Sequence, residues 1–251
     1  VYKRQRLRVQ VPKARYLAMW FMAQPNGRAR VCSRDGAGGV TRLNDLSGNR
    51  NNLTQNQSNK KPALVQSFSN GRAAIQFATT EYLVGNNAAA FDTGAGEFDV
   101  YAILNLSAGS TNQAFFGTRT SFAASQAGVS VMCTGAEKIR GSCSNGSSGK
   151  NTSVTSNAYN AKGFFLVRLQ RTGTTTGVYT LCSDGTTESK TVSDGGVSYN
   201  GGNFSIGALN TGNTGFAGYV MEVLAYKGVR LGDDDRNKVI RYLSSKYKLG
   251  L

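Results

Sequence analysis

The stretch that decides the fold reads Phe216-Ala-Gly-Tyr-Val-Met-Glu-Val-Leu-Ala-Tyr226, an apolar strand near the end of the chain. It leads into Leu231-Gly-Asp-Asp-Asp-Arg236, where three consecutive acids suit the first turn of a helix. Carboxylates are favoured there because they complement the exposed N–H groups and the helix dipole. Four later residues recur on one face at helical spacing: Val239, Ile240, Leu243 and Tyr247. The sequence therefore predicts a strand followed by a short amphipathic helix.

The side-chain types and their spacing give little support for a metal-binding site. Asp233, Asp234 and Asp235 suit calcium as an alternative to helix capping, but capping is the favoured interpretation and no cofactor is predicted. The chain has no His and 4 Cys, none of them in C-x-x-C spacing, which argues against zinc. Cys133 and Cys143 suit a disulfide across one hairpin, whereas free thiols are the favoured state of the cysteines.

Two segments alternate with the period of two that is typical of strands. Residues 98–106 and 164–170 each place apolar side chains at every second position. The predicted core members are Phe98, Val100, Leu104, Phe165, Val167 and Leu169. The intervening positions are predicted to lie on open strand faces, where the candidate ligand-binding residues are Asp99, Tyr101, Asn105, Arg168 and Gln170. This pattern predicts two antiparallel sheets packed face to face.

Length and composition agree with a single all-β domain. The chain has 251 residues, of which 39% are hydrophobic and 31 are Gly, as expected for many short strands joined by tight turns. No apolar run approaches the roughly 18 residues of a membrane-spanning helix, so no membrane span is predicted.

The chain is strongly basic, with 29 Lys+Arg against 14 Asp+Glu and a formal net charge of +15. Residues 1–15 are predicted to form an arm with six cations: Lys3, Arg4, Arg6, Arg8, Lys13 and Arg15. Removing these six leaves +9, so the domain predicted over residues 16–251 is basic as well. Residues 1–5 resemble a translated sequencing adaptor of a metagenomic fragment, or else an ordinary processed terminus. The charge favours anionic partners, or it serves solubility alone.

A series of short motifs carries a family resemblance from about Trp20 onward. They include Asp45-Leu-Ser-Gly-Asn-Arg-Asn51, then Pro62 with Asn70-Gly-Arg-Ala-Ala-Ile-Gln-Phe77, and finally the strand and helix described above. In this order they resemble the LamG-type jelly-roll domains of bacterial and phage surface proteins, in the concanavalin A-like lectin/glucanase superfamily. The resemblance implies an all-β, two-sheet antiparallel jelly-roll sandwich with a short C-terminal helix. Asp45 and Glu222 are interpreted as scaffold residues.

Catalysis is tested on one strand. The absence of His excludes Ser-His-Asp and Cys-His nucleophiles and leaves carboxylate chemistry, chiefly glycoside hydrolysis. Glu97-Phe-Asp99-Val-Tyr-Ala102 partly matches the E-x-D-x-x-E strand of jelly-roll glucanases, but Ala102 stands where the last carboxylate is expected. The chain is therefore predicted not to be an enzyme.

Three functions are compared. The first is a non-enzymatic carbohydrate-binding or adhesion module for an anionic glycan or cell surface. The alternative is a structural protein of a phage or virus particle, with the arm as an anchor to nucleic acid or to neighbouring virion subunits. The third is a divergent glycoside hydrolase. The first two predict an extracellular, cell-surface or virion location.

Overall fold

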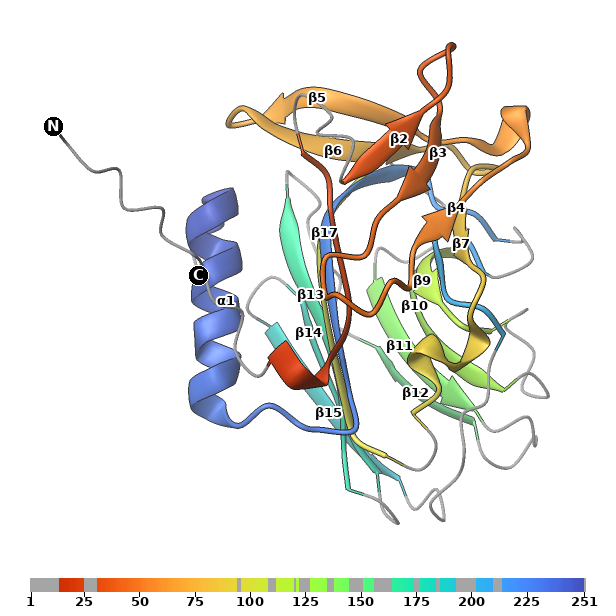
Figure 1. Cartoon of the computed structure of the whole chain (residues 1–251). Coiled ribbons are helices and arrows are strands. Elements are labelled where there is room, and N and C mark those ends of the chain that lie inside the picture. Colours follow the sequence, from red (N-terminus) through yellow and green to blue (C-terminus); the bar gives the residue numbers. More distant parts are fainter. Residues whose placement is uncertain are drawn as a thin grey trace, which may run out of the picture.

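A computed structural model describes residues 14–24, 31–93, 96–107, 112–119, 121, 127–134, 138–144, 151–155, 164–173, 177–183, 186–192, 202–209 and 214–250. Within this part of the chain, two antiparallel sheets lie face to face and one α-helix lies against the outer face of the first (Figure 1). The predicted all-β sandwich with a short C-terminal helix is confirmed. No helix among the described residues is long and apolar enough to cross a membrane.

The first sheet has eight described strands in the order β15-β14-β13-β8-β17-β6-β5, with β1 also paired to β17. Their bounds are β1 Leu17–Met22, β5 Ala63–Ser69, β6 Arg72–Phe77, β8 Phe98–Leu106, β13 Phe165–Thr172, β14 Gly177–Ser183, β15 Thr186–Val192 and β17 Gly218–Lys227. Strand β17 pairs with β8 along one edge, and with β6 and then β1 along the other. The fold-deciding stretch of the sequence is thus a central strand of this sheet.

The second sheet has nine described strands in the order β12-β11-β10-β9-β16-β7-β4-β3-β2. Their bounds are β2 Cys32–Arg34, β3 Val40–Leu43, β4 Leu53–Thr54, β7 Leu83–Gly85, β9 Gln113–Gly117, β10 Gly128–Thr134, β11 Lys138–Ser144, β12 Asn151–Thr155 and β16 Ser205–Ile206. The described residues also include three short 3₁₀ helices: η1 Ala14–Tyr16 before β1, η2 Ser58–Lys60 between β4 and β5, and η3 Ala88–Phe91 between β7 and β8.

The core lies between the two sheets. All six residues predicted from the alternating pattern are members of one buried cluster, each 3% exposed or less: Phe98, Val100, Leu104, Phe165, Val167 and Leu169. Aromatic side chains from η3 and from both sheets fill its centre, with Phe91 in edge contact with Phe98, Phe116 and Phe204. Period-two alternation therefore identified the inner face of the first sheet correctly.

The outer face of the first sheet is covered by helix α1, Asp233–Tyr247. Val239, Leu243 and Tyr247 are buried in a second cluster together with outward-facing residues of β8 and β17, such as Tyr101 and Leu224. The predicted helix face is confirmed, but the prediction that the outer strand face is open is wrong. Both faces of β8 are buried because an amphipathic helix must bury its apolar side, and this face is where it packs.

The structure contradicts one of the two expectations for the cysteines, the disulfide between Cys133 and Cys143. Cys32 is a buried free thiol, and burial raises its pKa to about 11. In the β10–β11 hairpin Cys133 lies opposite Ile139 and Cys143 lies opposite Val129, so these two cysteines do not face each other. The side chain of Cys182 lies outside the described residues.

Candidate functional site

Residues 45–51 form a turn, here called the Asp45 turn, that is hydrogen-bonded to β1, the first described strand. Asp45 Oδ1 accepts hydrogen bonds from the backbone N–H groups of Trp20 and Ser47, both at 2.9 Å. Asp45 Oδ2 accepts from Ser47 Oγ at 2.8 Å and from the Asn51 N–H at 3.0 Å. A short carboxylate surrounded by backbone donors is the chemistry of an Asx-type turn. The scaffold role expected for Asp45 is confirmed.

Two amides of the same turn extend this attachment. Asn49 Nδ2 donates to the carbonyls of Leu17 at 2.7 Å and Ala18 at 3.1 Å, and Asn51 Nδ2 donates to Ala18 at 3.0 Å. Asn87, just before η3, then donates from Nδ2 to Asn51 Oδ1 at 3.2 Å. Three segments far apart in the sequence are thus connected by amide side chains at the start of β1.

A groove of ≈ 350 Å³ opens at this point, and we call it the amide groove. Its base includes Leu17, Ala18, Ala89 and Ala90. Its polar and aromatic lining comes from η1, the Asp45 turn, the loop before η3 and the end of β17: Arg15, Tyr16, Asn49, Asn51, Asn87 and Lys227. The volume falls within the range of roughly 300–1,000 Å³ that is typical of small-molecule sites.

The groove offers donors, one aromatic ring and no acid. Arg15 places its guanidinium carbon 4.7 Å from the centre of the Tyr16 ring. Lys227 Nζ donates to the Ala89 carbonyl at 2.7 Å, which fixes the ammonium and leaves two of its three N–H groups for a ligand. No carboxylate is found among the described residues that line it. Neutral or anionic polar ligands therefore suit this groove better than cations do.

Four of the five candidate ligand-binding residues are buried instead of lying on an open face. Asp99, Tyr101, Arg168 and Gln170 are each 6% exposed or less, so their predicted exposure is wrong. Asn105 is half-buried near the end of β8. Of the predicted arm, Arg15 lies at the amide groove, whereas Lys3, Arg4, Arg6, Arg8 and Lys13 lie outside the described residues. None of these observations tests a binding role.

The buried polar residues form their own network. Arg168 donates from Nε to Asp99 Oδ1 at 2.9 Å and from a terminal nitrogen to Oδ2 at 3.1 Å. Tyr101 and Gln170 donate to Asp99 Oδ2 as well, at 3.1 and 3.0 Å. Burial disfavours the Arg168 cation, but the adjacent carboxylate outweighs it and raises the pKa of Arg168. A charged side chain tolerates such burial only when it is paired and hydrogen-bonded, as it is here.

Glu97 and Ala102, the other residues compared with the glucanase motif, also make contacts within the protein. Glu97 accepts hydrogen bonds from the backbone N–H groups of Gly173 and Arg230, both at 3.1 Å. Ala102 is buried in the core between the sheets. The carboxylates of this strand therefore hold loops and the sheet together.

Glu222 forms a second buried polar cluster, between β17 and helix α1. Its carboxylate accepts hydrogen bonds from Trp20 Nε1, Tyr242 Oη, Lys246 Nζ and Tyr247 Oη, at distances of 2.6–2.8 Å. The expected scaffold role is confirmed, with the difference that its donors come from α1 and β1 and not from a loop.

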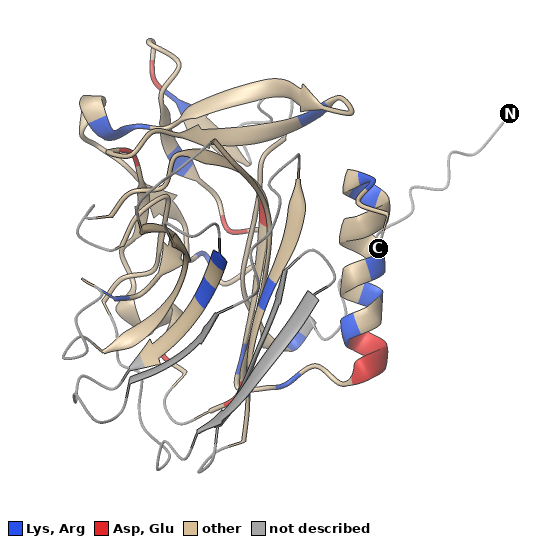
Figure 2. Cartoon of the chain, turned by 180° about the vertical axis from the view of Figure 1, so that it is seen from behind, with Lys and Arg blue, Asp and Glu red and all other residues tan. Residues whose placement is uncertain are grey.

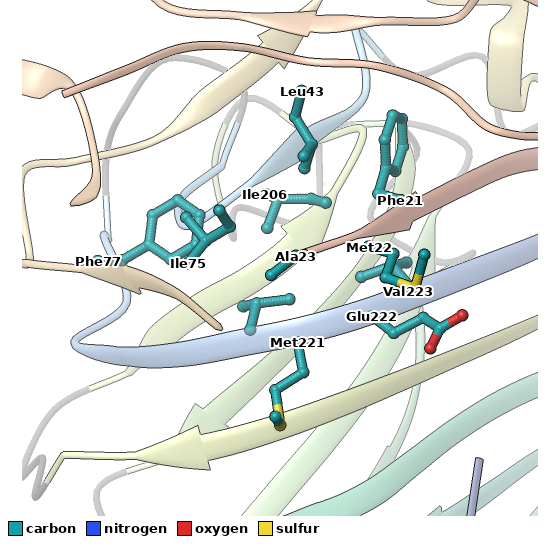
Figure 3. Close-up of a pocket in the computed structure, with 11 residues that line it drawn as sticks. Phe21, Met22, Ala23, Leu43, Ile75, Phe77, Ile206, Met221, Glu222 and Val223 are labelled. Atoms are coloured by element: carbon teal, nitrogen blue, oxygen red, sulfur yellow. The ribbon is translucent and has the colours of Figure 1, made fainter. Parts of the chain in front are cut away.

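A further cavity lies between the sheets and holds no candidate site. It has a volume of only ≈ 10 Å³ and is lined by apolar side chains of both layers, such as Phe21, Leu43 and Ile75. Figure 3 shows the Glu222 carboxylate directed away from these side chains, toward the other side of β17. A space of this size holds at most one water molecule, and a water molecule needs polar partners.

The three consecutive acids lie in the first turn of α1, as predicted (Figure 2). The N-cap residue is Gly232, and no side chain makes a capping hydrogen bond there. Asp233 pairs with Arg236 at 2.8 Å and Asp235 with Lys238 at 3.3 Å. Among the described residues no group of three or more His, Cys, Asp or Glu is arranged to hold a metal ion. Lys and Arg occur on the rest of the helix and on strands of both sheets (Figure 2).

Comparisons with known proteins show the fold but no family. No family model and no curated protein matches the sequence. Among solved structures, the binding domain of Paraclostridial Mosquitocidal Protein 1 matches with a TM-score of 0.63 and 10% identity, over 92% of this chain and 53% of that one. The binding domain of botulinum neurotoxin serotype D matches with a TM-score of 0.61 and 12% identity, over 92% and 51%. Trypanosoma rangeli sialidase matches with a TM-score of 0.58 and 11% identity, over 91% and 33%.

These matches concern function only through the shared architecture. The chain spans about a third to a half of the length of these structures, and its identity to them is low, so the likeness concerns the sandwich architecture. These structures do not confirm the LamG-type assignment. The prediction that the chain is not an enzyme is wrong, because the matching structures include sialidases and arabinofuranosidases. Neither the fold nor the sequence of one strand excludes an enzyme. The sandwich is compatible with enzymes as well as with binding domains, and fold alone does not decide between them.

Proposed function

We propose that this protein is a carbohydrate-binding or adhesion module that acts outside the cell, on a cell surface or a virion. The amide groove carries the proposal, because it joins amide, cationic and aromatic side chains in one hollow of ≈ 350 Å³. Sugars present hydroxyl groups that pair with amides and apolar ring faces that pack on aromatic side chains. Pockets that bind small polar ligands combine such an apolar base with a few fixed polar groups.

Preorganisation supports this assignment. Asn49, Asn51 and Asn87 are held by hydrogen bonds to backbone or to one another, so a ligand does not have to order them. Side chains that are already fixed lose less conformational entropy on binding, which favours affinity. The matching structures include a sialidase in complex with sialic acid, which supports a sugar ligand, and two toxin binding domains, which support a binding role. The net charge of +15 favours an anionic glycan or an anionic surface.

The test is a glycan array probed with the full chain, followed by calorimetric titration of the glycans that bind. Ala89→Trp places a large side chain in the groove. Ala88→Trp is the matched control, because Ala88 is an exposed residue of the same 3₁₀ helix that does not line the groove. Ala89→Trp is expected to weaken binding by at least tenfold, and Ala88→Trp to leave it unchanged. An array without bound glycans, or equal affinities for both variants, would contradict the proposal.

A further inference from the structure

We infer that the amide groove selects sugars that carry a carboxylate, and that Arg15 and Lys227 together bind that carboxylate. The inference rests on the proposed function and names the ligand class of the same groove. Arg15 comes from η1 at the start of the described chain and Lys227 from the end of β17, and both line the groove. No acid lines it within the described residues, so nothing in the lining neutralises the two cations.

Arg15 and Lys227 each make a contact that leaves N–H groups available to donate to a ligand. Arg15 lies over the Tyr16 ring, a contact that is compatible with hydrogen bonds from the edge of the guanidinium. The N–H groups at that edge match both oxygens of a carboxylate. Lys227 uses one N–H on the Ala89 carbonyl, and its position on the groove wall is fixed by that bond. The two side chains thus provide a forked donor and a point charge to one anion.

The third element is an acceptor. Both described side-chain hydrogen bonds of Asn49 are donated by its Nδ2 atom, to the carbonyls of Leu17 and Ala18. The amide orientation they impose leaves Oδ1 as the acceptor of an exposed side chain that lines the groove. A ligand that offers a carboxylate to the cations and hydroxyl groups to Asn49 satisfies the whole lining. Sialic and uronic acids have this combination, whereas a bare phosphate or a neutral sugar has only part of it.

A pair of specific cations differs from diffuse basic charge in its dependence on salt. A polyanion that neutralises many cations releases many counterions, so its affinity falls steeply with salt. A single carboxylate held by two side chains loses affinity only modestly over the same salt range, because few ions are released. The groove inference therefore predicts that the affinity for a short acidic sugar falls less steeply with salt than any affinity for single-stranded DNA, a polyanion without carboxylates.

The experiment titrates the full chain with 3′-sialyllactose, with its methyl ester and with lactose. Removing one charge-assisted contact is expected to lower affinity by about 10- to 100-fold. Arg15→Gln and Lys227→Gln should each do so for 3′-sialyllactose, and Lys227→Arg should retain binding because it keeps the charge. Arg42→Gln is the matched control, since Arg42 is exposed on β3 and does not line the groove. The thermal midpoint of each variant confirms that the fold is intact.

The outcomes separate this inference from the proposed function. If lactose and the ester bind as tightly as 3′-sialyllactose and Ala89→Trp abolishes binding, the groove binds sugars but the carboxylate inference is wrong. If Arg42→Gln loses as much affinity as Arg15→Gln, diffuse charge explains the binding and the inference is also wrong. If no sugar binds to the groove, both proposals are refuted.

Discussion

Replacing Glu222 by Gln should destabilise the protein by about 3–5 kcal/mol, the range found when one partner of a buried ion pair is removed. The side chain of Glu222 is 0% exposed and that of Lys246 is 15% exposed, so solvent screens their interaction little. The substitution leaves the Lys246 ammonium facing a neutral amide, and three further donors lose a charged acceptor. For a domain of this size, the loss corresponds to a fall of about 6–20 °C in the thermal midpoint.

Urea unfolding followed by tryptophan fluorescence measures this loss, because Trp20 donates directly to Glu222. The control is Asp234→Asn, an exposed carboxylate in the first turn of α1, which should cost less than about 1 kcal/mol. Adding Lys246→Met to Glu222→Gln removes the stranded cation, so the double variant should be more stable than the sum of the single effects by about 1–3 kcal/mol. A Glu222→Gln variant within about 1 kcal/mol of the wild type would refute the reasoning.

Three further outcomes are expected. Burial and the Glu222 carboxylate raise the pKa of Tyr247 well above 10.0; because the unfolded state releases this proton first, the stabilisation is complete below pH 10 and is lost above it. The chain has 11 Tyr, so the contribution of Tyr247 is the part of the 295 nm absorbance change that Tyr247→Phe removes. That part should appear together with unfolding, and its appearance near pH 10 in the folded protein would contradict this; Tyr247→Phe should also make the pH dependence of stability shallower. Asp45→Ala should cost about 1–3 kcal/mol because four donors lose their acceptor, and it should weaken glycan binding through Asn49 and Asn51; calorimetry of both properties checks this. Cys32, with a pKa of about 11, should resist iodoacetamide at pH 8 in the native state and react after unfolding; rapid native labelling at this site, seen by mass spectrometry, would be inconsistent with its burial.

The inner face of the sandwich was predictable because it depends on local alternation. Phe98, Val100 and Leu104 show it without reference to any other segment. The outer face was misread because Tyr101 was interpreted as an exposed residue of a mixed face. A signal was available: Leu166, Met221 and Leu224 are apolar at outward positions, and a helix with an apolar side follows them. Taken together, these patterns indicate a strand face that is covered by the helix.

The amide groove was not predictable as a unit because its parts come from separate regions of the chain. Asn49 and Asn51 were recognised only as members of the motif at residues 45–51, and Arg15 as part of a basic arm, each for a local reason. Asn87 and Lys227 carry no motif, and only the pairing of β1 with β17 brings Lys227 to the same place as Arg15. Such a site depends on long-range sheet topology, about which a single sequence contains little information.

The position of β17 also constrains how the protein is made. Residues 218–227 lie between β8 on one side and β6 and β1 on the other, and Leu17 of β1 pairs with Tyr226 of β17. During synthesis, β1, β6 and β8 leave the ribosome long before the strand that joins them. Contacts of this sequence separation slow folding, and unpaired strand edges on a nascent chain are prone to aggregation. The first sheet can therefore close only after β17 has been synthesised, and a ribosome-bound chain ending before residue 218 should expose the unpaired edges of β1, β6 and β8.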